Sequence, residues 1–163
     1  MVELKKITHN NLKELLNLEV SEAQKVCVAD NTRSLIDAYI SLSSGFHATA
    51  YAIYASDIMV GFLMYDYWND CTWKTIPAKT YFIWRLMIDK KYQGNGYGKQ
   101  AMEKIIDEIK TFPYGEAECI TTSYDISDVG PQGFYKSLGF RETGELFTED
   151  ENEDIEMLAR LEI

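Results

Sequence analysis

An apolar run leads into a glycine-rich loop and then into an amphipathic helix between residues 81 and 109. The run Tyr81–Ile88 is rich in aromatic and branched side chains, which predicts a central strand buried on both faces. Behind the loop, apolar residues recur at i, i+3, i+4 and i+7 from Met102 to Ile109, the pattern of a helix with one buried face. A strand, a tight loop and a helix in this order indicate the α/β class.

The loop between this strand and this helix has the chemistry of an anion site. Gly94, Gly96 and Gly98 let an oxygen atom approach the backbone, and the N–H groups of a first helical turn have no partner within the helix. The spacing is G-x-G-x-G, so it is neither the dinucleotide fingerprint G-x-G-x-x-G nor a P-loop, which needs Ser or Thr after Gly98-Lys99. From the glycines alone, a flexible loop remains an alternative to a phosphate site.

The remaining elements follow from periodicity and turn signals. A strand from Val2 to Lys6 precedes two helices, one behind Thr8 or Asn10 and one behind Asp30 that Gly45 closes. The other expected elements are strands at His47–Ala55 and Ile58–Tyr67 with a hairpin turn at Ser56-Asp57, a strand at Glu118–Tyr124, a helix at Gln132–Leu138 closed by Gly139, and strands at Phe140–Phe147 and Ile155–Leu161. This order, β-α-α-β-β-β-α-β-α-β-β, predicts one domain over residues 1–163 with a mixed sheet and helices on both faces.

Charge and cysteine content narrow the function classes. The formal net charge of −10 disfavours a nucleic-acid partner, because such a field repels phosphate backbones. Three scattered cysteines fit a reducing compartment, and neither a signal-peptide core nor an apolar stretch of membrane-spanning length is visible, so we expect a cytoplasmic protein without a membrane partner. With only His9 and His47, we expect no metal site.

Two motifs carry a resemblance to a known family. Gln93-x-x-Gly96-x-Gly98 after the strand resembles the acetyl-CoA signature of the GNAT superfamily of N-acetyltransferases, and Phe134-Tyr135-Lys136-Ser137-Leu138-Gly139-Phe140 is similar to its second block. The resemblance spans nearly the whole chain and implies a GNAT fold with splayed central strands and acetyl-CoA as co-substrate. It also makes a homodimer one expectation, because many members are dimers. The implied cofactor contacts are Leu86, Met87, Ile88, Gln93, Gly94, Asn95, Gly96, Tyr97, Gly98, Lys99, Asp128 and Lys136. At Asp128 the family often has Asn, and Pro131 stands where a small Ala is common.

Tyr135 is the candidate general acid. When an amine attacks a thioester, a thiolate leaves, and a phenol with a pKa of about 10 can protonate it. Without the motif, Tyr135 would be one of 11 tyrosines and a packing residue would be the simpler interpretation.

The acceptor is suggested by a finer resemblance to bacterial spermine/spermidine (diamine) N-acetyltransferases. It rests on Phe82–Asp89 running into Tyr92-Gln93-Gly94, and on Val28-Ala29-Asp30-Asn31. The resemblance implies that a polyamine binds near Glu19, Glu22, Asp37 and Trp84, although these acids could equally be solvated surface groups. Another amine, such as an aminoglycoside or a protein N-terminus, and a non-catalytic acyl-CoA sensor remain alternatives.

Overall fold

The computed structural model describes residues 1–25, 27–148 and 155–163. Its elements are β1 (Val2–Lys6), α1 (His9–Leu16), the 3-10 helix η1 (Glu22–Gln24), α2 (Asn31–Ser43), β2 (Thr49–Ala55), β3 (Ile58–Trp68), β4 (Thr80–Ile88), α3 (Tyr97–Ile109), β5 (Cys119–Asp125), α4 (Val129–Ser137), β6 (Arg141–Phe147) and β7 (Glu156–Glu162). The predicted order of strands and helices is confirmed, and η1 is an addition to it.

Several predicted bounds differ from the structure. The strand expected from His47 begins at Thr49, and the one expected to end at Tyr67 continues to Trp68. The last short helix begins at Val129 rather than Gln132, because Asp128 caps it and Pro131 falls in the first turn, where a missing N–H costs no helical hydrogen bond.

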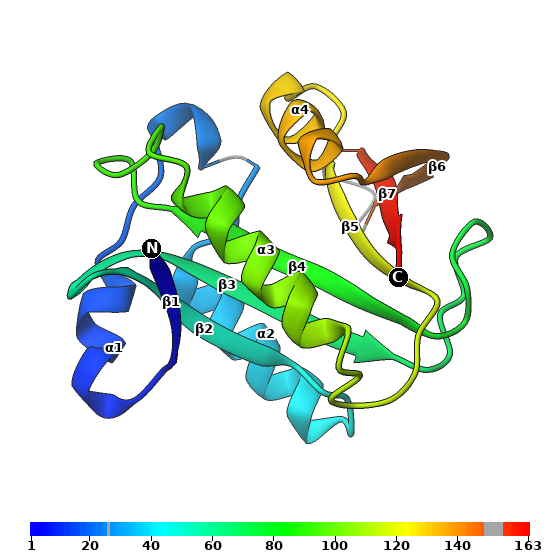
Figure 1. The fold of residues 1–163 in the computed structure, drawn as a ribbon, viewed down its shortest axis with the longest axis horizontal. Coiled ribbons are helices and arrows are strands. Elements are labelled where there is room, and N and C mark those ends of the chain that lie inside the picture. Colours follow the sequence, from blue (N-terminus) through cyan, green and yellow to red (C-terminus); the bar gives the residue numbers. More distant parts are fainter. Residues whose placement is uncertain (26, 149–154) are drawn as a thin grey trace.

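The seven strands form one mixed sheet in the order β1-β2-β3-β4-β5-β7-β6. Only the central pair, β4 and β5, is parallel. Side chains alternate between the two faces: Leu63 and Tyr65 belong to the core under α3, whereas Phe62 and Met64 pack with α1 and α2. Figure 1 shows α3 crossing in front of the sheet and α2 behind it. The expected α/β sheet with helices on both faces is therefore confirmed.

The central strands separate halfway along their length. β4 and β5 pair from Thr80↔Cys119 to Ile83↔Thr122, after which β4 continues to Ile88 with β3 as its paired neighbour. Figure 1 shows the two strands diverging beyond this point. We call the region between the diverging parts, residues 84–88 and 123–125, the split. The predicted splay of the central strands is thus present.

A β-bulge lies at the start of the split. Met64 of β3 pairs with Arg85 and its neighbour Tyr65 pairs with Ile83, so Trp84 is the extra residue on β4. A bulge bends its strand and redirects its side chains, and this one places Trp84 and Arg85 together on the face that carries α2.

Candidate functional site

Asp89 anchors the loop that follows β4. Its buried carboxylate accepts hydrogen bonds from the backbone N–H of Lys91 (2.9 Å) and from that of Glu19 (3.0 Å). Its own N–H donates to the Val60 carbonyl at 2.8 Å. One side chain therefore fixes both the glycine loop and the segment that joins α1 to α2.

The loop itself is held by side-chain amides. Asn95 donates from Nδ2 to the carbonyls of Tyr92 (2.9 Å) and Gln93 (3.2 Å), which closes a tight turn. Gln93 donates from Nε2 to the Ile88 carbonyl at 2.9 Å and to Gln24 of η1 at 3.0 Å. The loop is thereby tied to the end of β4 before any ligand binds.

The N-terminus of α3 fits an anion. Gly94 and Gly96 have φ of +79° and +75°, which L side chains rarely adopt, and a Cβ on either would meet nothing within 4 Å. The first intrahelical bond runs from Gln100 N–H to the Gly96 carbonyl, so the earlier N–H groups of the helix have no acceptor within it. Open space, glycine backbone and unpaired donors together are the features of an anion-binding helix N-terminus.

The side chains around this turn have different surroundings. Tyr97 is half-buried against the main core, and Lys99 lines a hollow of about 530 Å³ between α3 and the end of α4. A Cβ at Gly98 would lie 3.5 Å from Ile88 and 3.6 Å from the Phe134 ring. At Gly98 the glycine loop therefore contacts the Phe134–Phe140 motif, because α4 packs closely on the start of α3 there.

The end of β4 presents backbone to the split. Leu86 and Ile88 pack toward α3, and the buried Met87 packs toward α1 and α2. All three pair with β3 on one edge, whereas the pairing with β5 stops at Ile83. Among the described residues, their backbone on the other edge therefore has no paired strand.

Tyr135 lies in the main core with its ring fixed on three sides. It stacks on Tyr124 at a centroid distance of 5.7 Å and meets Phe134 and Phe140 edge-on at 5.1 Å and 5.4 Å. Burial raises the pKa of Tyr135, and a hydrogen bond with the Thr122 hydroxyl partly opposes that rise. Thr122 also donates to the Ile83 carbonyl at 3.3 Å, and these two residues form the last β4–β5 pair. The phenol is therefore protonated at neutral pH and lies where the strands separate.

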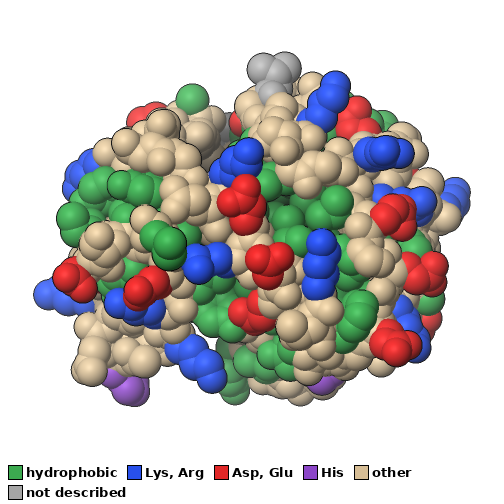
Figure 2. Space-filling model, in the orientation of Figure 1, with side chains coloured by type: hydrophobic (Ala, Val, Ile, Leu, Met, Phe, Trp, Pro, Cys, Tyr) green, Lys and Arg blue, Asp and Glu red, His purple; other side chains and the backbone are tan. Residues whose placement is uncertain are grey.

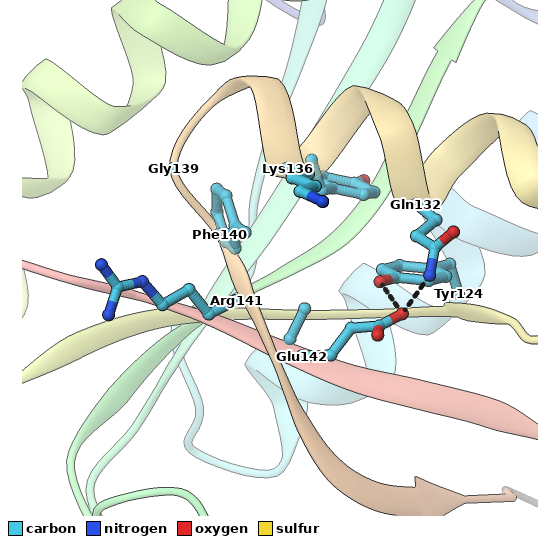
Figure 3. Close-up of a pocket in the computed structure, with 9 residues that line it drawn as sticks. Tyr124, Gln132, Lys136, Gly139, Phe140, Arg141 and Glu142 are labelled. Carbon is cyan, nitrogen blue, oxygen red and sulfur yellow. Dashed lines mark hydrogen bonds between the residues drawn. The ribbon is translucent and has the colours of Figure 1, made fainter.

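Asp128 and Lys136 lie at opposite ends of α4. Asp128 caps the helix, its Oδ1 accepting from the Gly130 N–H at 2.9 Å. Lys136 borders a hollow of about 500 Å³ in which Tyr124 and Gln132 both donate to Glu142 at 2.9 Å (Figure 3). The lining of this hollow comes from β5, α4, β6, β7 and the turn before β6, and it includes Tyr135 and one residue of the split, Tyr124.

On the opposite face, Trp84 and Asp37 belong to a small polar cluster. Asp37 forms ion pairs with Arg33 (2.8 Å) and Arg85 (3.5 Å), and only 11% of its side chain is exposed. Arg85 donates to the Trp84 carbonyl and lies 5.5 Å from the centre of the Trp84 ring. The indole N–H of Trp84 is buried and has no hydrogen-bond partner within the described part of the chain.

Glu19 and Glu22 form exposed ion pairs at the surface. Glu19 pairs with Lys90 at 2.7 Å, which lowers the pKa of Glu19 and raises that of Lys90 through the hydrogen bond and the mutual charge. Glu22 pairs with Lys25 at 2.6 Å. Each of the acids predicted to bind the acceptor, including Asp37, thus already has a basic partner within the chain.

Three residues of the site were not singled out from the sequence: Thr122, Asp89 and Gln24. Asp89 had a usable signal, because an acid that directly follows a buried strand often caps the next turn. Thr122 and Gln24 carry no such signal, since their partners lie 13 and 69 residues away and depend on the fold. Residues 1–25, 27–148 and 155–163 contain no cluster of potential metal ligands and no helix long and apolar enough to cross a membrane.

Comparisons with known proteins agree with this geometry. Residues 12–140 match the model of the Acetyltransferase (GNAT) family. A probable spermine N(1)-acetyltransferase of Bacillus subtilis subsp. natto is 26% identical over 145 residues, 89% of this chain and 91% of that protein. The spermine/spermidine N(1)-acetyltransferase of Bacillus subtilis strain 168 is 25% identical over the same shares. The spermidine N-acetyltransferase of Vibrio cholerae, solved with CoA and spermine, has a TM-score of 0.69 at 13% identity, covering 99% of this chain and 95% of that one.

The fold is that of an acyl-CoA-dependent acyltransferase. Its defining features are a mixed sheet with a split central pair and a glycine loop that leads into a helix at that split. The chain belongs to the GNAT family of acetyltransferases. Its co-substrate is acetyl-CoA.

Proposed function

We propose that the protein transfers the acetyl group of acetyl-CoA to a primary amine of a polyamine such as spermine or spermidine, with Tyr135 as general acid. The observation that carries the proposal is the buried hydroxyl of Tyr135, in contact with Thr122 where β4 and β5 separate. A protonated phenol at that point lies between the strands that would hold the thioester. The similarity to spermine and spermidine acetyltransferases supports the choice of acceptor.

The cofactor contacts follow from the split and the loop. In the proposal, the backbone of Leu86, Met87 and Ile88 binds the pantetheine arm, and the N–H groups from Gln93 to Lys99 bind the pyrophosphate. Asp128 and Lys136 at the ends of α4 are the remaining proposed contacts. The Asp128 carboxylate already caps its helix, so any contact there would use the oxygen that does not accept from Gly130.

The reaction is a direct transfer. The amine nitrogen bonds to the acetyl carbon, the carbon–sulfur bond breaks, and Tyr135 gives its proton to the departing thiolate. The amine's extra proton leaves to water, and water returns a proton to Tyr135. The raised pKa of Tyr135 keeps this proton in place at neutral pH. The acceptor must arrive neutral, and at a pKa of about 10.4 only about one amine in a thousand is neutral at pH 7.

Glu19, Glu22, Asp37 and Trp84 are proposed to bind the acceptor. A polyamine ammonium would replace Lys90 or Lys25 beside its glutamate, and because exposed ion pairs contribute little to stability, such an exchange costs little. The Trp84 ring can hold a second ammonium by a cation–π contact. Asp37 is less available, since two arginines already hold it.

A protein N-terminus is the second candidate acceptor, and one observation favours it. The buried N–H of Trp84 has no acceptor among the described residues, and a buried donor without a partner is costly. A peptide carbonyl could accept from it, whereas the ammonium groups of a polyamine are donors only.

The test is release of CoA thiol from acetyl-CoA with spermine, spermidine, a monoamine, an aminoglycoside and a peptide, at low and high salt. The polyamines should have the highest kcat/KM. Because the Debye length is about 8 Å at physiological salt, their advantage should shrink as salt is added. A preference for the peptide would overturn the polyamine assignment and leave the acetyltransferase intact.

The acids are tested by charge-matched variants. Neutralising Glu19, Glu22 and Asp37 together should lower the polyamine kcat/KM about tenfold or more, since several weak pairs add up. The control removes three charges at exposed acids away from these positions, by Glu3→Gln, Asp57→Asn and Glu118→Gln. If both variants lost kcat/KM for the polyamine equally, the effect would come from net charge alone.

A further inference from the structure

Three carboxylates are buried within residues 1–25, 27–148 and 155–163, those of Asp66, Asp89 and Asp125. Both oxygens of Asp66, and both of Asp89, accept hydrogen bonds from N–H or O–H groups. At Asp125, Oδ1 accepts from the Ser127 N–H at 2.7 Å, whereas Oδ2 accepts from the Cys27 thiol at 3.6 Å. A thiol is a weak donor. One oxygen of the buried Asp125 carboxylate can therefore still accept from a stronger donor.

Asp125 is the last residue of β5 and lies in the split. Successive side chains of a strand point to opposite faces, and its neighbour Tyr124 stacks on Tyr135 of α4. Asp125 therefore points away from α4, toward Cys27 in the segment between η1 and α2. The proposed cofactor contacts lie on the side of α3 and α4. An acceptor would thus approach the thioester from the face on which Asp125 lies.

The charge of Asp125 is not matched by a base. Among the described residues no ion pair involves Asp125, whereas Glu19, Glu22 and Asp37 each have a basic partner. Hydrogen bonds from Ser127 lower the pKa of Asp125, although burial opposes them. The carboxylate is therefore ionised at neutral pH, and a cation that reaches it has no lysine or arginine to displace.

We propose, on the basis of the function proposed above, that Asp125 binds a second ammonium group of the polyamine and sets the preference for polyamines over monoamines. A strand rises about 3.3 Å per residue, so Asp125 lies roughly 10 Å along β5 from Thr122, which contacts Tyr135. The amine that attacks beside Tyr135 is thus distant from this carboxylate, which can hold another nitrogen of the same chain. The separation also suits the reaction, because a carboxylate next to the attacking amine would favour its charged form.

The test is Asp125→Asn, which keeps the shape of the side chain and removes its charge. The kcat/KM for spermidine should fall about 10–100-fold, because a hydrogen bond between charged groups is lost. The loss should appear in KM, with kcat at saturating spermidine within about twofold of the parent, since the contact is present before and during the reaction. The kcat/KM for butylamine should also stay within about twofold, because a monoamine has no second ammonium group.

The matched control is Glu118→Gln, which removes one charge at an exposed residue just before the other end of β5. It should leave the kinetics of both amines unchanged. If Asp125→Asn kept the parental kcat/KM for spermidine, or lost as much for butylamine, Asp125 would not determine specificity and the inference would be wrong. A parent that does not prefer spermidine over butylamine would refute the polyamine acceptor itself, and this inference with it.

A second variant addresses the same oxygen if Asp125→Asn fails to fold. Cys27→Lys places an ammonium of the chain itself beside Oδ2 of Asp125, where it should compete with the polyamine. Cys27→Met is its control, because it adds a long side chain without a charge. The lysine variant should have about 10-fold or more lower kcat/KM for spermidine than the methionine variant, with similar values for butylamine. Equal kcat/KM for spermidine in the two variants would overturn the inference.

Discussion

Replacing Tyr135 by Phe removes one hydroxyl and keeps the ring that packs against Tyr124, Phe134 and Phe140. The hydroxyl contacts Thr122, which still has the Ile83 carbonyl as an acceptor in the variant. We therefore expect the free energy of unfolding to fall by no more than about 1.5 kcal/mol, the net value of one hydrogen bond.

The effect on catalysis should be much larger. Losing a general acid typically lowers kcat by about 10²–10⁴, which corresponds to about 3 to 5 kcal/mol of transition-state stabilisation. The affinity for acetyl-CoA should not change, because the proposed binding contacts lie in β4, the glycine loop and the ends of α4. The variant should thus bind the cofactor normally and turn it over slowly.

The assay follows CoA thiol release at saturating amine and acetyl-CoA, with calorimetry for cofactor affinity and urea unfolding for stability. Tyr124→Phe is the matched control: it removes a hydroxyl from the ring stacked on Tyr135, but that hydroxyl donates to Glu142 of β6 and not to Thr122. Its kcat should stay within about twofold of the parent. If Tyr135→Phe turned over at the parental rate from pH 7 to 9, Tyr135 would be a packing residue.

Three further outcomes follow from the same geometry. Gly96→Val should abolish acetyl-CoA binding measured by calorimetry. Gly144→Val, with a similar φ of +79° and equally open space, should bind acetyl-CoA normally. Equal affinities in the two variants would show that the phosphate site lies elsewhere. The kcat/KM for a primary amine should rise with pH from 7 to 9, because the amine loses its proton over this range. It should not fall below about pH 10, because a general acid works below its pKa and the pKa of Tyr135 is raised. A fall in kcat/KM below pH 9 would contradict this expectation. Asp89→Ala should lower the free energy of unfolding in urea by about 1–3 kcal/mol and weaken acetyl-CoA binding, since two N–H groups lose their acceptor. An unchanged affinity for acetyl-CoA would show that Asp89 does not position the glycine loop for binding.

The elements with strong local signals were predictable from the sequence. β4, the glycine loop and α3 follow from an unbroken apolar run, three glycines and a helical repeat, and the structure has all of them in place. The start of α4 was expected at Gln132, whereas the cap at Asp128 sets it at Val129. The bulge at Trp84 was not predictable, because it depends on the register of β3 against β4 and no glycine marks it.

The site was predictable in its backbone and much less in its side chains. The glycine positions and Tyr135 come from motifs that act over a few residues. The ion pairs of Glu19 with Lys90 and of Asp37 with Arg85 join residues 71 and 48 positions apart, so only the folded chain brings them together. The resemblance suggested these acids as groups that bind the acceptor, and the structure shows that each has a basic partner.

In the proposal, acetyl-CoA binds in the split and on the N-terminus of α3, on a face whose surface carries both acidic and basic side chains (Figure 2). Amide hydrogen exchange with and without CoA tests it most directly, because the claim concerns backbone N–H groups. CoA should slow exchange at residues 86–88 and 94–99 in the parent and should leave these residues unchanged in Gly96→Val. Protection confined to residues 139–142, beside the hollow at the end of α4, would contradict the account.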